Sequence, residues 1–294
     1  MITPELRGHL DVSAASGLIC HDRTLHVVAD DELFLDSYDT SSLQRTARLR
    51  LLEGELPQEH AARKRAKPDF ESLTWLGQDV ALALGSGSAP GTRERGVRLL
   101  WNAQTGAFDS TPQLVDLRPL YDALRRRECP GLNIEGAAVQ GDYLRLLQRG
   151  AKGVGNAVID LLLSAVLSSI QTRACIDASA IERVLPVRLG ELSGVGLSFT
   201  DACTIDNDGQ TLLFSAAAER TDNAYDDGEC VGSVIGVLDA DGSVGAVYPL
   251  LGRHKVEGIV ATRRYGLLLV ADPDNRDARA PVLRCALPGP LGSA

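Results

Sequence analysis

One stretch, Ile134-Glu135-Gly136-Ala137, places an acidic residue between apolar and small neighbours, and this pattern recurs along the chain. The other three copies are Phe70-Glu71-Ser72-Leu73, Thr200-Asp201-Ala202-Cys203 and Val256-Glu257-Gly258-Ile259, at intervals of 64, 66 and 56 residues. Each copy is followed 9 to 11 residues later by a second apolar run. A degenerate fifth copy begins at Ser16-Gly17-Leu18, so one repeated unit covers the whole chain. Repeats of this length, built from short strands, predict a β-propeller.

Each unit aligns into four strand-like runs separated by turn residues. The expected runs are 16–21, 24–29, 33–39 and 46–52 in the first unit, 70–76, 79–84, 97–102 and 113–117 in the second, 134–139, 143–148, 157–162 and 183–189 in the third, and 200–205, 211–217, 233–239 and 244–249 in the fourth. The fifth unit supplies only 256–262, 266–271 and 281–286. We expect the segment Leu6 to Val12 to add the missing strand, because closing the ring removes exposed strand edges.

The prediction is therefore an all-β protein, a five-bladed β-propeller of four-stranded antiparallel blades closed by an N-terminal strand. A six-bladed ring stays open as the alternative, because the third unit is long. Pro119 to Arg127 and Leu163 to Arg173 have apolar residues at helical spacing and basic ends, which predicts short helices between blades. The second segment also fits an extended buried strand. We expect one propeller domain over residues 1–287 and a flexible tail over 288–294.

Composition excludes several classes of function. The formal charge of −9 disfavours contact with a phosphate backbone, so we expect no nucleic-acid partner, and the basic run Arg63 to Lys67 is interpreted as a solvated surface loop. No run of 18 apolar residues and no secretory leader occur, which predicts a cytoplasmic protein without a membrane partner. None of the six cysteines forms a CxxC pair, so we expect free thiols that are mostly buried.

The repeated acids are the main candidates for chemistry. The first strand of a propeller blade lines the central channel, so Glu71, Glu135, Asp201 and Glu257 should meet at one mouth of that channel, with Ser16 or its neighbour in the fifth place. Close carboxylates raise one another's pKa unless a cation compensates them. Their oxygen ligands suit Ca²⁺ or Mg²⁺, whereas no His or Cys cluster with zinc spacing occurs. Two other roles stay open: pairing with arginines, and capping of backbone amides in the adjacent blade.

The loops that follow the second strands lie on the same face and supply polar groups for a ligand. The candidates for ligand binding are Ser86, Ser88, Arg149, Lys152, Arg220 and Asn223. Glycines beside basic residues permit close approach of a polar or anionic group, and a plain flexible loop is the alternative. His254 precedes the fourth copy of the pattern and, with Glu135, is the candidate acid or base. No P-loop, Rossmann motif or GxSxG elbow is present.

The chain resembles an uncharacterised family of single-domain bacterial propellers. The similarity is carried by Gly85-Ser86-Gly87-Ser88, Asn133-Ile134-Glu135-Gly136-Ala137, Gln148-Arg149-Gly150, Asp222-Asn223 with Asp226-Asp227-Gly228, and Lys255-Val256-Glu257-Gly258. The Glu-Gly step that opens a strand is also similar to esterase-like phytases and SdiA-regulated propellers. The resemblance implies the propeller fold and names no reaction.

Two hypotheses of function follow. The first is a hydrolase of a phosphoester, ester or lactone, assisted by Ca²⁺ or Mg²⁺, with the four repeated acids as metal ligands or base. The second is a non-catalytic propeller without a cofactor that binds a small polar or anionic molecule, or a protein, on the same face. Neither the substrate nor a partner protein can be named from the sequence.

Overall fold

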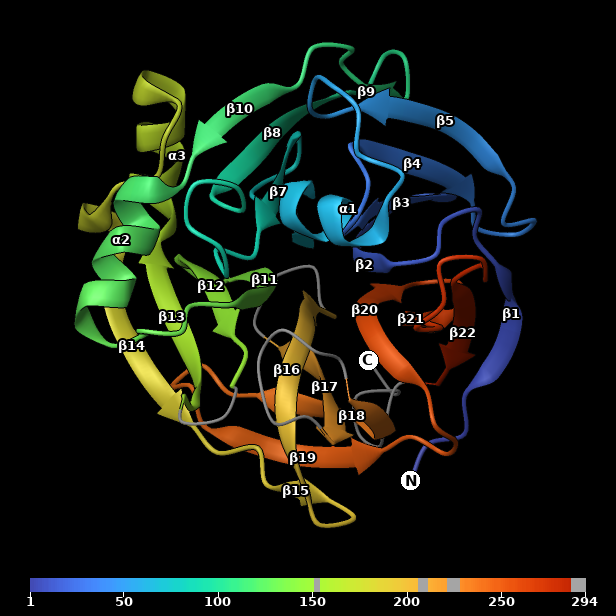
Figure 1. Ribbon diagram of the computed structural model, residues 1–294. Helices are drawn as coiled ribbons and strands as arrows, with labels where there is room; N and C mark the ends of the chain where they lie inside the picture. Colours follow the sequence, from blue (N-terminus) through green and yellow to red (C-terminus); the bar gives the residue numbers. More distant parts are fainter. Residues whose placement is uncertain (151–153, 206–210, 221–227, 287–294) are drawn as a thin grey trace.

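The computed structural model describes residues 1–294 except 151–153, 206–210, 221–227 and 287–294. Five antiparallel sheets surround a common centre (Figure 1). The first blade consists of β2 (Ala15–His21), β3 (Thr24–Ala29), β4 (Phe34–Asp39) and β5 (Arg45–Arg50). The second consists of β6 (Phe70–Trp75), β7 (Val80–Gly85), β8 (Arg95–Asn102) and β10 (Gln113–Asp116), with β9 (Ala107–Phe108) paired to β8. The third consists of β11 (Ile134–Gln140), β12 (Tyr143–Gln148), β13 (Asn156–Leu162) and β14 (Ile181–Val187).

The fourth blade has an additional short strand, and the fifth contains both ends of the described chain. The fourth blade consists of β15 (Glu191–Leu192), β16 (Val195–Thr204), β17 (Leu212–Arg220), β18 (Glu229–Leu238) and β19 (Val244–Pro249). The fifth consists of β20 (Lys255–Thr262), β21 (Gly266–Asp272), β22 (Pro281–Cys285) and β1 (Glu5–His9). β1 pairs with β22, with Glu5 opposite Arg284 and His9 opposite Pro281. The predicted closure by an N-terminal strand is confirmed, and the ring has five blades, not six.

Both predicted helices are present between strands. α2 (Arg118–Arg127) joins the second and third blades, and α3 (Leu163–Arg173) follows β13 directly, so the strand alternative for that segment is wrong. A short 3₁₀ helix, η1 (Ala178–Ala180), precedes β14. Among the described residues no helix is long and apolar enough to span a membrane. The tail expected at 288–294 lies outside the described residues.

A third helix, α1 (His60–Ala66), corrects the prediction of a loop around the basic run. Glu59 caps it, since its carboxylate accepts hydrogen bonds from the amides of Ala61 and Ala62 at 2.8 and 2.7 Å. None of the residues in α1 is buried. Without an apolar face the segment has no helical hydrophobic period, which explains why pattern reasoning missed it.

The repeated acidic pattern coincides with an irregularity in every blade. The five inner strands contact one another in a closed ring, β2 to β6, β11, β16, β20 and back to β2. Each inner strand shifts register against the second strand of its blade at the repeat, between Ala15 and Leu18, Phe70 and Ser72, Ile134 and Gly136, Phe199 and Asp201, and Val256 and Gly258. A β-bulge re-aims the side chain at the extra residue, which is the repeated glutamate in three blades and Ser16 with Gly17 in the first. In the fourth blade the extra residue is Thr200 and Asp201 pairs with Ser215, so the predicted equivalence of Asp201 with the glutamates is wrong by one residue.

The glycine of the pattern has a packing role between blades. A Cβ added at Gly258 would lie 1.9 Å from the carbonyl oxygen of Ser16, and one at Gly17 would lie 2.4 Å from the amide of Leu73. At Gly136 the nearest atom, the carbonyl carbon of Asp201, would be 2.8 Å away. Each contact joins one inner strand to the backbone of the next blade. The Glu-Gly step therefore combines a polar residue at the bulge with close approach of neighbouring blades.

Candidate functional site

The four repeated acids lie near one another at one mouth of the channel. Burial raises the pKa of Glu71, Asp201 and Glu257 well above ordinary carboxyl values, and the negative charge of Glu135 adds to each of these rises. This mutual influence requires that the carboxyl groups converge from four successive blades. The four acids therefore lie close enough for their charges to interact, and their role as a metal or catalytic site stays a prediction.

Asp201 connects two blades. Its Oδ2 accepts a hydrogen bond from the amide of Ile259 in β20 at 2.8 Å. Ser16 has the same role at the fifth position, since its hydroxyl donates to the carbonyl of Phe70 in β6 at 2.5 Å. At both positions the polar residue links adjacent blades; Asp201 has the amide-capping role that the sequence left open, whereas Ser16 donates to a carbonyl. The other three positions carry the longer glutamate side chain.

Glu135 and Arg149 form a buried polar group with Glu219. An Arg149 Nη lies 3.5 Å from Glu135 Oε2, and the other Nη lies 3.0 Å from Glu219 Oε1. The side-chain amide of Asn133 donates from Nδ2 to Glu135 Oε1 at 2.5 Å. Burial raises the pKa of Glu135 to about 7, although the positive charge of Arg149 opposes the rise. A carboxyl group that titrates near neutral pH can both accept and donate a proton there.

Lys255 lies among four carboxylates. Its Nζ is 3.0 Å from Asp274, 3.3 Å from Glu257 and 3.6 Å from Asp272, and 4.0 Å from Glu219. Only 6% of its side chain is exposed, so this ammonium group is screened little by water. Lys255 therefore neutralises part of the negative charge that Glu257 brings to the channel.

A third polar group surrounds Asp69. Lys67 Nζ lies 2.8 Å from Asp69 Oδ1 and also contacts Asp30, while an Arg93 Nη lies 2.8 Å from Asp69 Oδ2. Burial alone would raise the pKa of Asp69, but Lys67 and Arg93 outweigh burial and lower it. Ser86 and Ser88 complete the group, since both hydroxyls donate to Asp69 Oδ2.

Asp30, Asp69 and Glu71 offer the described carboxylate oxygens best placed to share a metal ion. One oxygen from each lies within 4.8 Å of the others. Hard oxygen donors suit Ca²⁺ or Mg²⁺. The ammonium of Lys67 already contacts two of these three carboxylates, so a metal ion here would compete with it. Of the four acids predicted as metal ligands, Glu71 belongs to this group, whereas Glu135 and Glu257 pair with Arg149 and Lys255.

The remaining candidates are placed less centrally. The ring of His254 lies beside the backbone of Gly252, and its carbonyl accepts a hydrogen bond from Ser233. Within the described part of the chain, no hydrogen bond or ion pair joins that ring to the carboxylates of the mouth. Arg220 ends β17 as an exposed residue. Lys152 and Asn223 lie outside the described residues.

Sequence reasoning missed several charged residues of the mouth, namely Asp30, Lys67, Asp69, Glu219, Lys255, Asp272 and Asp274. Three of them share one signal. Antiparallel pairing places the end of the second strand beside the start of the first, as with Lys255 opposite Asp272 and Ile134 opposite Gln148. A search for polar residues at the end of every second strand would have found Asp30, Glu219 and Asp272.

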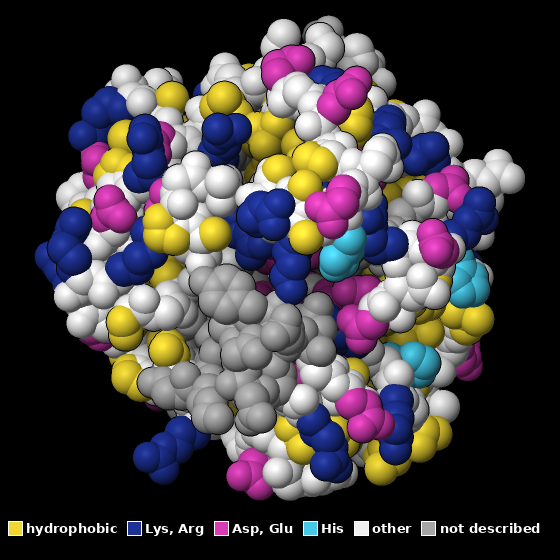
Figure 2. All heavy atoms as spheres, viewed as in Figure 1, with side chains coloured by type: hydrophobic (Ala, Val, Ile, Leu, Met, Phe, Trp, Pro, Cys, Tyr) yellow, Lys and Arg dark blue, Asp and Glu magenta, His cyan; other side chains and the backbone are white. Residues whose placement is uncertain are grey.

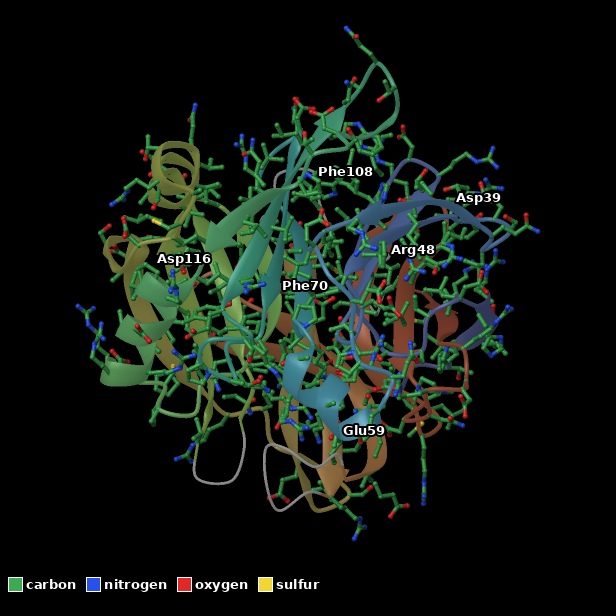
Figure 3. The ribbon with its side chains drawn as sticks, turned by 45° about the horizontal axis from the view of Figure 1, so that its top comes forward. Asp39, Arg48, Glu59, Phe70, Phe108 and Asp116 are labelled. Carbon is green, nitrogen blue, oxygen red and sulfur yellow. The ribbon has the colours of Figure 1, made fainter. Side chains whose placement is uncertain are left out.

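A cavity of about 460 Å³ adjoins these groups. It lies between α1 and the segments that follow β3 and β21, and Asp30, Lys67, Asp272 and Asp274 belong both to its wall and to the charged groups described above. Figure 1 shows α1 in front of the ring near its centre, and Figure 3 labels Glu59 at its N-terminus and Phe70 at the start of β6. Figure 2 shows acidic and basic side chains close together around the centre of this face.

Comparisons with known proteins support the fold. The solved structures that are similar include a glutaminyl cyclase from Myxococcus xanthus, with a TM-score of 0.52 and 11% identity over 97% of this chain and 98% of that chain. A glucose dehydrogenase is similar with a TM-score of 0.51 and 10% identity, over 97% of this chain and 99% of that chain. At such identities the likeness concerns the fold alone. Comparison with curated proteins gives no match.

The family comparison covers nearly the whole chain. Residues 11–287 match the model of DUF6929, which is described as a family of unknown function. This agrees with the resemblance to an uncharacterised family, whereas the similarity to esterase-like phytases and SdiA-regulated propellers stays a prediction. The chain belongs to the family of unknown function DUF6929.

Proposed function

We propose that the channel mouth is the active site of a hydrolase that cleaves an ester, phosphoester or lactone bond in a small polar molecule. The observation that carries the proposal is Glu135, a buried carboxyl group whose pKa is raised to about 7 by burial beside the Arg149 guanidinium. Perturbed carboxyl groups of this kind are typical of acid–base catalysis. A cavity of about 460 Å³, the size of a small-molecule site, is lined by Asp30, Lys67 and Asp272 of the neighbouring charged groups, although not by Glu135 or Arg149 themselves.

In this proposal Glu135 acts as the base and then as the acid. Its carboxylate takes a proton from the attacking water, and the resulting carboxylic acid returns that proton to the leaving oxygen. Arg149 stabilises the negative charge that develops on the attacked group, because its guanidinium has donors beyond those that reach Glu135 and Glu219. Ser86 and Ser88 are the nearby hydroxyls that we assign to substrate binding, with Arg220 at the rim.

The metal-assisted form of the proposal uses a different set of residues from the one expected. Asp30, Asp69 and Glu71 would hold Ca²⁺ or Mg²⁺ in place of the Lys67 ammonium. When bound, such an ion would polarise the scissile group. We place the activity in the cytoplasm, as expected from the sequence, and the six free cysteines agree with a reducing compartment.

The non-catalytic alternative also has an observation in its favour. Asp201 is bonded to the amide of Ile259, Asp69 to two cations, and Glu257 to Lys255, so these carboxylates are paired without any ligand. A mouth satisfied in this way can hold adjacent blades together or present a binding surface. It would bind a molecule without converting it.

Measurement of turnover distinguishes the hydrolase from the non-catalytic binding propeller. We expect wild-type protein to hydrolyse at least one of p-nitrophenyl acetate, p-nitrophenyl phosphate and γ-butyrolactone, with a rate that changes around pH 7. Glu135→Gln should lower kcat by about 100-fold or more, the usual contribution of a general base. Glu128→Gln, on the exposed end of α2, is the matched control. Absence of turnover with all three substrates, or full activity in Glu135→Gln, would contradict the hydrolase and favour the binding propeller.

Divalent ions provide a separate test of the metal-assisted form. An ion that binds only the folded state raises the melting temperature by mass action, and a chelator reverses the rise. Asp69→Asn should abolish the effect if Asp30, Asp69 and Glu71 hold the ion. A melting temperature that responds to neither Ca²⁺ nor Mg²⁺ would contradict the metal-assisted form and leave the acid–base form as the remaining mechanism.

A further inference from the structure

Three of the repeated acids are glutamates, and each follows a polar residue that stands two positions earlier in the chain. These polar residues are Asp69 and Asn133, which directly precede β6 and β11, and Lys255, the first residue of β20. Their places are equivalent in the fold as well, since the amide of Ser86 donates to the carbonyl of Asp69 at 2.9 Å. The amide of Arg149 makes the corresponding bond to Asn133 at 2.8 Å. A second set of polar side chains therefore accompanies the glutamates at the mouth.

Two of these residues place a charge beside their glutamate. Lys255 brings a cation, because its Nζ lies 3.3 Å from Glu257 Oε1. Asp69 brings a second anion, because one of its oxygens lies within 4.8 Å of a Glu71 oxygen. An adjacent cation stabilises the ionised form of a carboxyl group, and an adjacent anion stabilises the protonated form. Each charge therefore favours a single protonation state of its glutamate.

Asn133 differs from the other two because it is a neutral donor. Its Nδ2 donates to Glu135 Oε1 at 2.5 Å, while an Arg149 Nη lies 3.5 Å from the other carboxyl oxygen, Oε2. The backbone of Asn133 is held on both sides, since its amide donates to Oε1 of the buried Gln148 at 2.9 Å and its carbonyl accepts from the amide of Arg149. Asn133 thus holds one carboxyl oxygen from a fixed backbone and leaves Oε2 as the oxygen that can exchange a proton.

We propose that Asn133 is a positioning residue for Glu135, whose side-chain amide fixes the carboxyl group by Oε1 so that Oε2 meets the reacting water beside Arg149. The inference rests on the proposed hydrolase and deepens it, because it explains why Glu135, rather than Glu71 or Glu257, transfers the proton. Oε2 takes a proton from the attacking water and returns it to the leaving oxygen as the bond from that oxygen to the acyl or phosphoryl centre breaks. Reacting groups keep such a place, within about 0.5 Å, only when neighbouring side chains support them.

The first test compares wild type with Asn133→Ala. Alanine removes the donor to Oε1 and adds no charge, and Asn133 is only half-buried, so the fold should persist. A hydrogen bond to the ionised form lowers the pKa of a carboxyl group, so its loss should raise the midpoint of the pH–rate profile by about one pH unit. Misalignment of Oε2 should lower kcat about 10-fold with little change in KM. A merely structural role would lower the melting temperature and leave the midpoint unchanged.

Two further variants copy the residues that stand at the equivalent places of the other blades. Asn133→Lys introduces a cation, as Lys255 does, and should lower the midpoint of the pH–rate profile by about one pH unit or more. Asn133→Asp introduces an anion, as Asp69 does, and should raise the midpoint by a similar amount. Shifts of opposite sign at one position cannot come from a general loss of stability. Asn133→Ala keeps the test decisive if a charged variant does not fold.

The controls keep the rest of the mouth constant. The other charged groups that act on Glu135 are the same in every variant, namely Arg149, Asp69, Glu219 and Lys255. Gln78→Lys and Gln78→Asp make the same changes of charge at an exposed residue in the turn between β6 and β7, at the end of the blade away from the mouth. These two variants should not move the midpoint.

A readout without substrate separates this inference from the hydrolase. Infrared difference spectra between each Asn133 variant and the same variant with Glu135→Gln report the titration of the Glu135 carboxyl group directly. We expect its midpoint to rise in the order Asn133→Lys, wild type, Asn133→Asp. Turnover with unchanged midpoints in the Asn133 variants, or equal shifts in the Gln78 variants, would overturn the inference and leave the hydrolase. The expected order without turnover of any substrate would contradict the hydrolase and leave the control of Glu135 by Asn133 standing.

Discussion

Replacement of Gly258 by alanine tests whether the repeated Glu-Gly step holds adjacent blades together. The added Cβ would lie 1.9 Å from the carbonyl oxygen of Ser16, and Leu18 Cδ2 and Val270 Cγ2 would be 2.3 and 2.8 Å away. Ordinary contact begins near 3.4 Å, so the first and fifth blades would have to separate by about 1.5 Å in a region packed as tightly as an organic crystal.

Overpacking of a core costs typically 1–3 kcal/mol, and here the closest atom is backbone rather than a flexible side chain. We therefore expect Gly258→Ala to lower the free energy of unfolding by about 3 kcal/mol or more. At roughly 2 to 4 °C per kcal/mol for domains of this size range, the melting temperature should fall by about 6 °C or more. Urea titration and thermal melting followed by circular dichroism measure both quantities.

Gly196→Ala in β16 is the matched control, because a Cβ at Gly196 would meet no atom within 4 Å. Alanine loses less conformational entropy than glycine, so this variant should be as stable as wild type or slightly more stable. Gly17→Ala and Gly136→Ala should destabilise in the order of their contacts, 2.4 Å before 2.8 Å. A Gly258→Ala protein with wild-type stability would refute the idea that the glycine permits the contact between blades.

Three further perturbations test other parts of the structure. Because burial raises the pKa of Glu135 from 4.5 to about 7, the folded state binds this proton more tightly than the unfolded state, and the free energy of unfolding should fall as pH rises from about 4.5 to about 7. Glu135→Gln should flatten that dependence in urea titrations at pH 5 and 7.5, and an unchanged slope would assign it to other groups. Arg145→Met removes the guanidinium 2.9 Å from buried Asp160, so the free energy of unfolding measured in urea should fall by about 3 kcal/mol. A variant as stable as wild type would mean that Arg183 alone compensates the charge of Asp160. Arg63→Ala removes the ion pairs of Arg63 with Asp31 and Glu32 from α1, which has no buried residue, so trypsin should cut after Lys64 faster than in wild type. Equal cleavage rates would show that other contacts hold the helix.

The repeat was a sufficient signal for the fold because strand formation depends on local alternation. Predicted runs such as 143–148 and 24–29 agree with β12 and β3 residue for residue, and the count of five blades follows from the five copies. The N-terminal strand could be predicted because the fifth unit lacked one. The helix α1 could not be predicted from the sequence pattern. Its stability comes from the Glu59 cap and from ion pairs of Arg63 with Asp31 and Glu32, and none of these produces a hydrophobic period.

The candidate site likewise has features that could be predicted from the sequence and features that could not. The sequence by itself determined that Glu71, Glu135 and Glu257 stand at equivalent places, because equal positions in a repeat become equal positions around a ring. Asp201 was expected at the same place, but it lies one residue further along its strand and pairs with Ser215. Only the tertiary structure decided what each acid contacts: Asp201 bonds the amide of Ile259, Glu135 meets Arg149, and Glu257 meets Lys255. The physical reason is that a carboxylate's protonation and partners depend on burial and on charges within a few ångströms. Some of those charges are close in the chain, as Lys255 is to Glu257, and others come from another blade, as Glu219 does to Arg149, so the period of the repeat does not fix them.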